Sequence, residues 1–265
     1  MRLRAIRRVS WIAACISLLT PLKAQQTNDW MTLTQQATVL INQGRFADAM
    51  PIARQALAVA KRAYTTQSLQ YALSLNGIGY LELATGDLAS AQTDLESAAV
   101  MVQAAAGKNS VQAMTPLANL GNLYLQQAQL QSANPTLQKS LLGKAETALR
   151  EVLSIAEANF KGADVNLSPP LQALAQVLCA EQKFTEAIQV EQRLLTIARA
   201  NLPADNPLIL KTRADLATTI LASGDTSTAL SQLKAVLVDA KRILPVGDSF
   251  TAAVQDIINQ ISEGP

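Results

Sequence analysis

The chain of 265 residues contains no histidine. Histidine is the usual base of a catalytic triad, the commonest metal ligand and the side chain that titrates near neutral pH. The sequence also lacks a Cys-x-x-Cys pair, a glycine-rich phosphate loop and an acidic metal-binding loop. These absences remove the common routes to hydrolysis, redox chemistry and metal binding. We therefore predict that the protein is not an enzyme and has no cofactor and no metal site.

Aromatic and charged residues are also scarce, at 4% and 16% of the chain. Five of the 22 basic residues lie in residues 1–24, which contain no acidic residue, so 17 basic residues face 20 acidic residues in the remainder. No basic stripe is present, and few aromatic rings are available to stack on bases. Both observations argue against binding to nucleic acid.

Residues 1–24 have the pattern of a secretory signal peptide. Four arginines precede a 12-residue apolar stretch over residues 9–20, and Leu22-Lys23-Ala24 ends in a small residue suited to cleavage. The apolar stretch is shorter than the roughly 20 residues of a transmembrane helix. We predict cleavage after Ala24 and a periplasmic or secreted protein. Two alternatives are an uncleaved anchor and a lipoprotein modified at Cys15, because Ile12-Ala13-Ala14-Cys15 resembles a lipobox.

The rest of the chain repeats one short signature. Taking Gly44 as the reference, the equivalent turn positions are 44, 86, 128, 182 and 224, so the spacings are 42, 42, 54 and 42 residues. A fixed period of this length is typical of a stacked helical solenoid. The single irregular step is a 12-residue insertion in the third copy.

Each copy contains two stretches with the i, i+3/i+4 spacing of an amphipathic helix, separated by a turn. In the second copy these stretches carry Leu75, Ile78 and Leu81 before the turn and Ala91 and Leu95 after it. Small residues recur at equivalent positions, where paired helices must approach closely. They are Ala37, Gly79, Gly121, Ala175 and Ala217 before the turns, and Ala49, Ala91, Ala145, Ala187 and Ala229 after them.

These segments resemble the tetratricopeptide repeat, and their 42-residue period resembles that of kinesin light chains. The resemblance rests on Leu75-Asn76-Gly77-Ile78-Gly79, Asn119-Leu120-Gly121-Asn122-Leu123-Tyr124, Gly44-Arg45-Phe46-Ala47-Asp48-Ala49, Lys183-Phe184-Thr185-Glu186-Ala187 and Asp205-Asn206-Pro207. It implies an all-α, right-handed solenoid of five helix pairs within residues 25–265. The expected repeats span residues 30–64, 72–106, 114–161, 168–202 and 210–243, and a capping helix spans residues 248–262.

Two segments depart from this regular pattern. The insertion at 131–142 begins with the turn signal Ser132-Ala133-Asn134-Pro135, after which Thr136 to Leu142 is expected to form a short helix. The insertion is either a tolerated surface loop or a partner contact. Residues 248–261 place Phe250, Val254 and Ile258 on one face. This face is expected to cover the last repeat, which would otherwise expose its stacking surface.

The resemblance also implies a binding site, because this family binds extended peptides or partner helices along its concave face. Aligned on the turns, that face contains mainly amide side chains, which donate and accept hydrogen bonds with a peptide backbone. Little charge is expected in the groove. The candidate residues are Asn76, Tyr80, Asn122, Gln126, Gln172, Gln176 and Arg213, with Leu83, Cys179 and Thr218 beside them.

The acidic residues Asp94, Glu96, Glu186 and Glu191 are scattered and are predicted to lie on solvated helix faces. The sequence thus favours an exported, non-enzymatic scaffold that holds a protein or an extended peptide in an envelope assembly or secretion process. Two alternatives are a homo-oligomer that associates through its edges or the insertion, and a scaffold tethered to a membrane by a lipid on Cys15.

Overall fold

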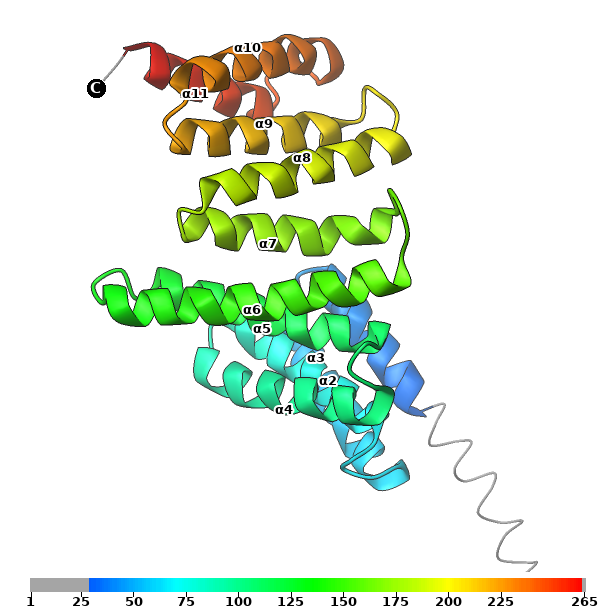
Figure 1. Cartoon of the computed structure of the whole chain (residues 1–265). Helices are drawn as coiled ribbons and strands as arrows, with labels where there is room; N and C mark the ends of the chain where they lie inside the picture. The colour runs from blue at the N-terminus through cyan, green and yellow to red at the C-terminus, as the bar shows by residue number, and fades with distance from the viewer. Residues whose placement is uncertain (1–28, 264–265) are drawn as a thin grey trace, which may run out of the picture. The chain divides into compact units, whose positions relative to one another are not determined.

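The computed structural model describes residues 29–263, in which the regular structure is entirely helical. The predicted signal peptide and Cys15 lie outside these residues. The helices follow one another as pairs joined by tight turns (Figure 1). The five pairs are residues 29–42 with α2 (Phe46–Ala63), α3 (Leu69–Thr85) with α4 (Leu88–Ala106), α5 (Val111–Gln129) with α6 (Pro135–Asn159), α7 (Ser168–Ala180) with α8 (Phe184–Asn201), and α9 (Pro207–Ala222) with α10 (Thr226–Ile243). The 3-10 helix η1 (Val165–Leu167) precedes α7, and α11 (Ser249–Glu263) follows the last pair.

The described residues form two compact units, one ending at Lys108 and the other beginning at Asn109. In the first unit, the described helices make two pairs, with α3 packed against both α2 and α4. In the second unit, each helix from α5 to α11 packs against the next along the chain. This sequential pairing confirms the predicted all-α fold of five helix pairs with a C-terminal helix.

Short polar side chains begin many of these helices. Asp87 accepts a hydrogen bond from the backbone N–H of Ser90 at the start of α4, and Asp225 does the same for Thr228 at the start of α10. Such caps satisfy N–H groups that have no partner within the helix. The preceding turns need a left-handed residue, which Gly86 supplies with a φ of 88°. The fourth pair uses Gln182 instead, with a φ of 61°.

The predicted close approach of paired helices is present where glycine faces leucine. A Cβ atom on Gly79 would lie 2.8 Å from Cγ of Leu95, and one on Gly121 would lie 2.6 Å from Cγ of Leu149. Leu95 and Leu149 are completely buried. The two glycines therefore allow α3 and α5 to pack directly on the leucines of their partner helices.

The insertion of the third copy, residues 131–142, forms a turn and the first part of helix α6. Ala128, aligned with the turn glycines, is buried within α5, and the turn comes later, before Asn134 caps α6. Residues 136–142 belong to the continuous 25-residue helix α6, so they are not the separate short helix that we expected. In Figure 1 this end of α6 extends past the α7–α8 turn. Leu130 and Leu137 are exposed there.

The C-terminal helix covers the last pair, as predicted. Val254 and Ile258 of α11 are buried against Leu233 and Val236 of α10 and Ala217 of α9. Phe250, Ile257 and Ile261 pack around this cluster. None of the helices in residues 29–263 has both the length and the apolar character needed to cross a membrane.

Candidate peptide-binding groove

Three helices of the second unit, α7, α8 and α9, enclose two adjoining cavities, which we call the groove. The first, the polar cavity, has a volume of about 300 Å³. Its walls include Gln172 and Gln176 of α7, Glu191 of α8, and Asp215 and Thr218 of α9. Most of the hydrogen-bonding groups of the groove lie in this cavity.

The second cavity, the apolar pocket, has walls that are mainly aliphatic. Leu194 and Ile197 of α8 and Leu208 of α9 line it, together with Val165 of η1. It shares Gln172, Leu194, Lys211, Thr212 and Asp215 with the polar cavity. An apolar side chain and a polar side chain of one bound segment therefore have neighbouring places to bind.

Four of the residues predicted from the sequence meet in the polar cavity. Gln172 and Gln176 are exposed on successive turns of α7, while Cys179 and Thr218, which also line the cavity, are partly buried. The Sγ atom of Cys179 lies 3.4 Å from Oγ1 of Thr219. Burial raises the pKa of the Cys179 thiol, so this cysteine is not an activated nucleophile.

Arg213 is also on α9 but lies outside both cavities. Its Nη1 atom donates to Oδ2 of Asp239 on α10 at 2.7 Å. This hydrogen bond, with a second from Arg242, lowers the pKa of the Asp239 carboxyl. Arg213 therefore forms an ion pair between α9 and α10 and does not line the groove.

The remaining predicted residues lie elsewhere. Asn122 and Gln126 are on α5, where Asn122 is exposed and Gln126 is partly buried, and neither lines the two cavities. Asn76 and Tyr80 belong to the first unit. Asn76 is only 8% exposed, so its amide presents little surface to a ligand.

Glu191 is the residue of the groove that the sequence prediction placed wrongly. It was expected on a solvated face, but it is 7% exposed and lines the polar cavity. Its Oε1 atom accepts a hydrogen bond from Oγ1 of Thr219 at 3.0 Å, whereas its Oε2 atom has no hydrogen-bond partner among the described residues. Burial, and secondarily the negative charge of Asp215, raises the pKa of Glu191 to about 7.

The repeat register contains the signal that would have identified this residue. Counted with the same spacings, Glu191 is equivalent to Leu95, Leu149 and Leu233, each of which is completely buried. A carboxylate at a core position is unusual because its desolvation is costly. The buried acid is therefore visible in the sequence once the copies are aligned by core position as well as by turn.

The first unit contains a second buried acid. Glu82 of α3 is 9% exposed, and burial, with additional repulsion from Asp94 and Asp87, raises its pKa. Asp94 is itself partly buried, and burial raises its pKa too, so the prediction that it lies on a solvated face was wrong. Glu96 is exposed, as expected.

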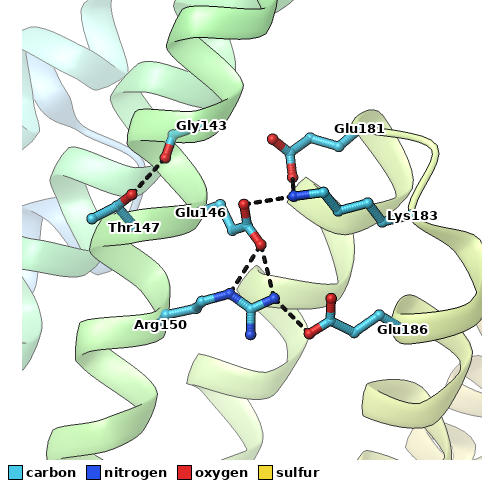
Figure 2. Close-up of polar contacts among 7 residues, drawn as sticks. All are labelled: Gly143, Glu146, Thr147, Arg150, Glu181, Lys183 and Glu186. Atoms are coloured by element: carbon cyan, nitrogen blue, oxygen red, sulfur yellow. Dashed lines mark hydrogen bonds and ion pairs between the residues drawn. The ribbon is translucent and has the colours of Figure 1, made fainter.

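One network of ion pairs, drawn in Figure 2, connects α6 to the α7–α8 turn and the start of α8. Glu146 of α6 accepts from Lys183 at 2.7 Å and from Arg150 at 2.8 Å. Arg150 also pairs with Glu186, and Lys183 with Glu181. Burial raises the pKa of Glu146, but the hydrogen bonds from Lys183 and Arg150 outweigh it and the net pKa is lowered. This network helps to hold one wall of the groove in place.

The helix pairs and the groove together define an all-α repeat protein with a cleft between stacked helices. The tetratricopeptide repeat family model matches residues 31–99 and, in a second overlapping register, residues 72–141. Residues 142–243 continue the same paired-helix architecture. Residues 31–141 therefore match the tetratricopeptide repeat family.

Solved structures with the same fold include proteins described as kinesin light chain-like. A putative kinesin light chain of Podosopora anserina with nearly identical TPR-like repeats has a TM-score of 0.66 and 17% identity, covering 80% of this chain and 95% of that one. BtubC (BKLC) from P. vanneervenii has a TM-score of 0.64 and 16% identity, covering 87% and 95%. At these identities the similarity shows the fold alone. Among curated proteins, none matches the sequence.

Proposed function

We propose that this protein is an exported, non-enzymatic scaffold that binds an extended segment of a protein partner in the groove between α7, α8 and α9. The observation that carries the proposal is the juxtaposition of exposed amides with an apolar pocket. Gln172 and Gln176 project from α7 beside the aliphatic walls formed by Leu194 and Leu208. Amides can bond the backbone of a peptide, and the pocket can bury one of its side chains.

Preorganisation favours this mode of binding. The ion pairs of Glu146 with Lys183 and of Arg150 with Glu186 already connect α6 to the start of α8, which forms one wall of the groove. A rigid site loses little conformational entropy when its ligand binds, so more of the contact energy appears as affinity. The matched family model describes a repeat and not an enzyme, which agrees with a purely binding role.

The direct test uses a phage-displayed library of random dodecapeptides on residues 25–265. We expect peptides to be enriched on this protein, and we expect the double substitution Gln172→Ala and Gln176→Ala to weaken the best peptide about tenfold or more, as loss of two or more hydrogen bonds would. The matched control is Gln189→Ala with Gln192→Ala, two exposed amides of α8 that line neither cavity. Absence of any enriched peptide, or equal affinity for both variants, would refute the groove.

Export is tested separately by the intact mass of the protein purified after expression of the full chain in a bacterial host. The proposal predicts a mature protein that begins at Gln25. A mass that includes a diacylglycerol at Cys15 would instead establish the lipoprotein. A mass that retains residues 1–24 would contradict cleavage, and neither result would bear on the peptide groove.

A further inference from the structure

The polar cavity contains an acidic group that the protein itself leaves incompletely paired. Glu191 is more than nine-tenths buried, and within residues 29–263 only its Oε1 atom has a hydrogen-bond partner. A buried carboxylate oxygen without a donor costs free energy comparable to a lost hydrogen bond. The cavity that Glu191 lines has about 300 Å³ of space, several times the ~30 Å³ share of one water molecule.

The charges around the cavity are unbalanced toward the negative. Glu191 of α8 and Asp215 of α9 both line it, and Lys211 is the only cation among the lining residues described. Lys211 is already paired, because its Nζ atom lies 2.9 Å from Oδ2 of Asp215. Among the described residues, Glu191 therefore has no cation of its own in the cavity.

The walls also suit a long side chain that has an apolar stem. Ala175 and Leu194 line the same cavity as Glu191, while Gln176 and Thr218 add polar groups. Lysine and arginine bury their methylene stems on apolar surface while the charged end stays paired. A carboxylate at the end of such a cavity provides the acceptor for a charge-assisted hydrogen bond.

We propose that the polar cavity binds a lysine or arginine side chain of the partner segment, with Glu191 as its ion-pair acceptor, while an aliphatic residue of the same segment fills the apolar pocket. The inference rests on the proposed peptide-binding function and names the chemistry of its ligand: a segment with a basic residue beside an aliphatic one. Because the two cavities share five lining residues, the two side chains of the ligand lie close together.

The first experiment repeats the dodecapeptide selection on the parent protein and on Glu191→Gln, which keeps a side-chain oxygen for the Thr219 hydrogen bond. We expect one strongly basic position among peptides selected on the parent, and we expect Glu191→Gln to lose that preference but keep the aliphatic one. Asp205→Asn, in the loop between α8 and α9, removes one exposed negative charge outside both cavities and serves as the control. Selected peptides without a basic preference would overturn this inference but not the proposed function, whereas failure to select any peptide would overturn both.

The second experiment is a double-mutant cycle with the best peptide. Replacing its arginine by citrulline, or its lysine by norleucine, removes the charge at similar size. On the parent protein we expect affinity to fall about tenfold or more, as for a hydrogen bond to a charged group, and on Glu191→Gln less than about twofold. Equal losses on both proteins would assign the basic residue to another acid and overturn the inference.

The pH dependence of binding provides an independent readout. Glu191 must be ionised to pair with a cation, and its pKa is about 7 in the free protein. We expect affinity to be constant above about pH 8 and to fall as the pH drops through 7. The other titratable groups that line the cavity are Cys179 of α7 and Lys211 and Asp215 of α9. They remain in Glu191→Gln, so a fall of the same size in that variant would contradict the role of Glu191.

Discussion

The α5–α6 and α7–α8 pairs place different chemistry at equivalent positions. In the α5–α6 pair, Leu149 packs so closely on Gly121 that no Cβ atom fits between them. In the α7–α8 pair, the corresponding residues are Glu191 and Ala175, and both line a cavity. The same repeat position therefore fills the interior of one pair and lines a cavity in the next.

This difference shows how a repeat protein can form a cavity lined by a buried acid without changing its fold. Most copies use the position for stability, through a leucine that is completely buried. One copy instead retains a carboxylate whose burial raises its pKa. Costly polar groups in otherwise consistent cores are expected where function outweighs stability.

The largest effect is expected when the buried leucine of α6 is replaced by glutamate, the residue that α8 has at the equivalent position. Leu149→Glu would introduce a carboxylate at a completely buried position, with Gly121 opposite and no designed partner. We expect the free energy of unfolding to fall by about 3–5 kcal/mol, because both the apolar burial of leucine and the hydration of the carboxylate are lost. Urea denaturation monitored by circular dichroism measures this change.

Leu149→Met is the matched control, because it conserves volume and apolar character. We expect it to cost less than about 1.5 kcal/mol. If Leu149→Glu were no more destabilising than Leu149→Met, the α5–α6 interior would tolerate a buried acid. The contrast between the two pairs would then have no energetic basis.

The reverse exchange, Glu191→Leu, is expected to stabilise the protein. Leu233 occupies the equivalent position opposite Ala217 in the last pair, so a leucine opposite Ala175 should fit. The pKa of Glu191 is about 7 in the folded state against an ordinary value of 4.5. At about 1.4 kcal/mol per pKa unit, the buried carboxylate costs roughly 3–4 kcal/mol above pH 7, and the substitution should recover a gain of this order.

The gain from Glu191→Leu should depend on pH. Because the folded-state pKa is raised, the folded protein retains the proton more strongly, and the stability contributed by Glu191 is complete below about pH 4.5 and lost as the pH rises through 7. The advantage of the variant should therefore grow between these values and then become constant. Thermal unfolding of both proteins at several pH values measures it, and an advantage independent of pH would show that folding does not change the pKa of Glu191.

The sequence was enough to predict the helix pairs, because turn glycines, small residues and apolar positions repeat together. The sequence also predicted that Gln172 and Gln176 lie on the same face, because the two residues are one turn apart on the same helix. It missed Glu191 because an acidic residue on a helix is ordinarily solvated, and only its register relative to Leu149 and Leu233 shows that it is buried. Arg213 was misjudged for a different reason: its partner Asp239 lies on another helix, 26 residues away in the sequence.

The smallest expected effect concerns the α3–α4 pair of the first unit, in which a glycine packs directly on a leucine. Two glycines of α3 provide the test. A Cβ atom added at Gly79 would collide with Leu95, whereas one added at Gly77 would meet nothing within 4 Å. Alanine is favoured over glycine in a helix by about 1 kcal/mol, and overpacking costs about 1–3 kcal/mol. We expect Gly77→Ala to stabilise the protein by about 0.5–1 kcal/mol and Gly79→Ala to destabilise it by about 1 kcal/mol, as measured by urea denaturation. If both substitutions were stabilising, Leu95 would have room to move. Close contact between glycine and leucine would then not be what distinguishes the α3–α4 and α5–α6 pairs from the α7–α8 pair.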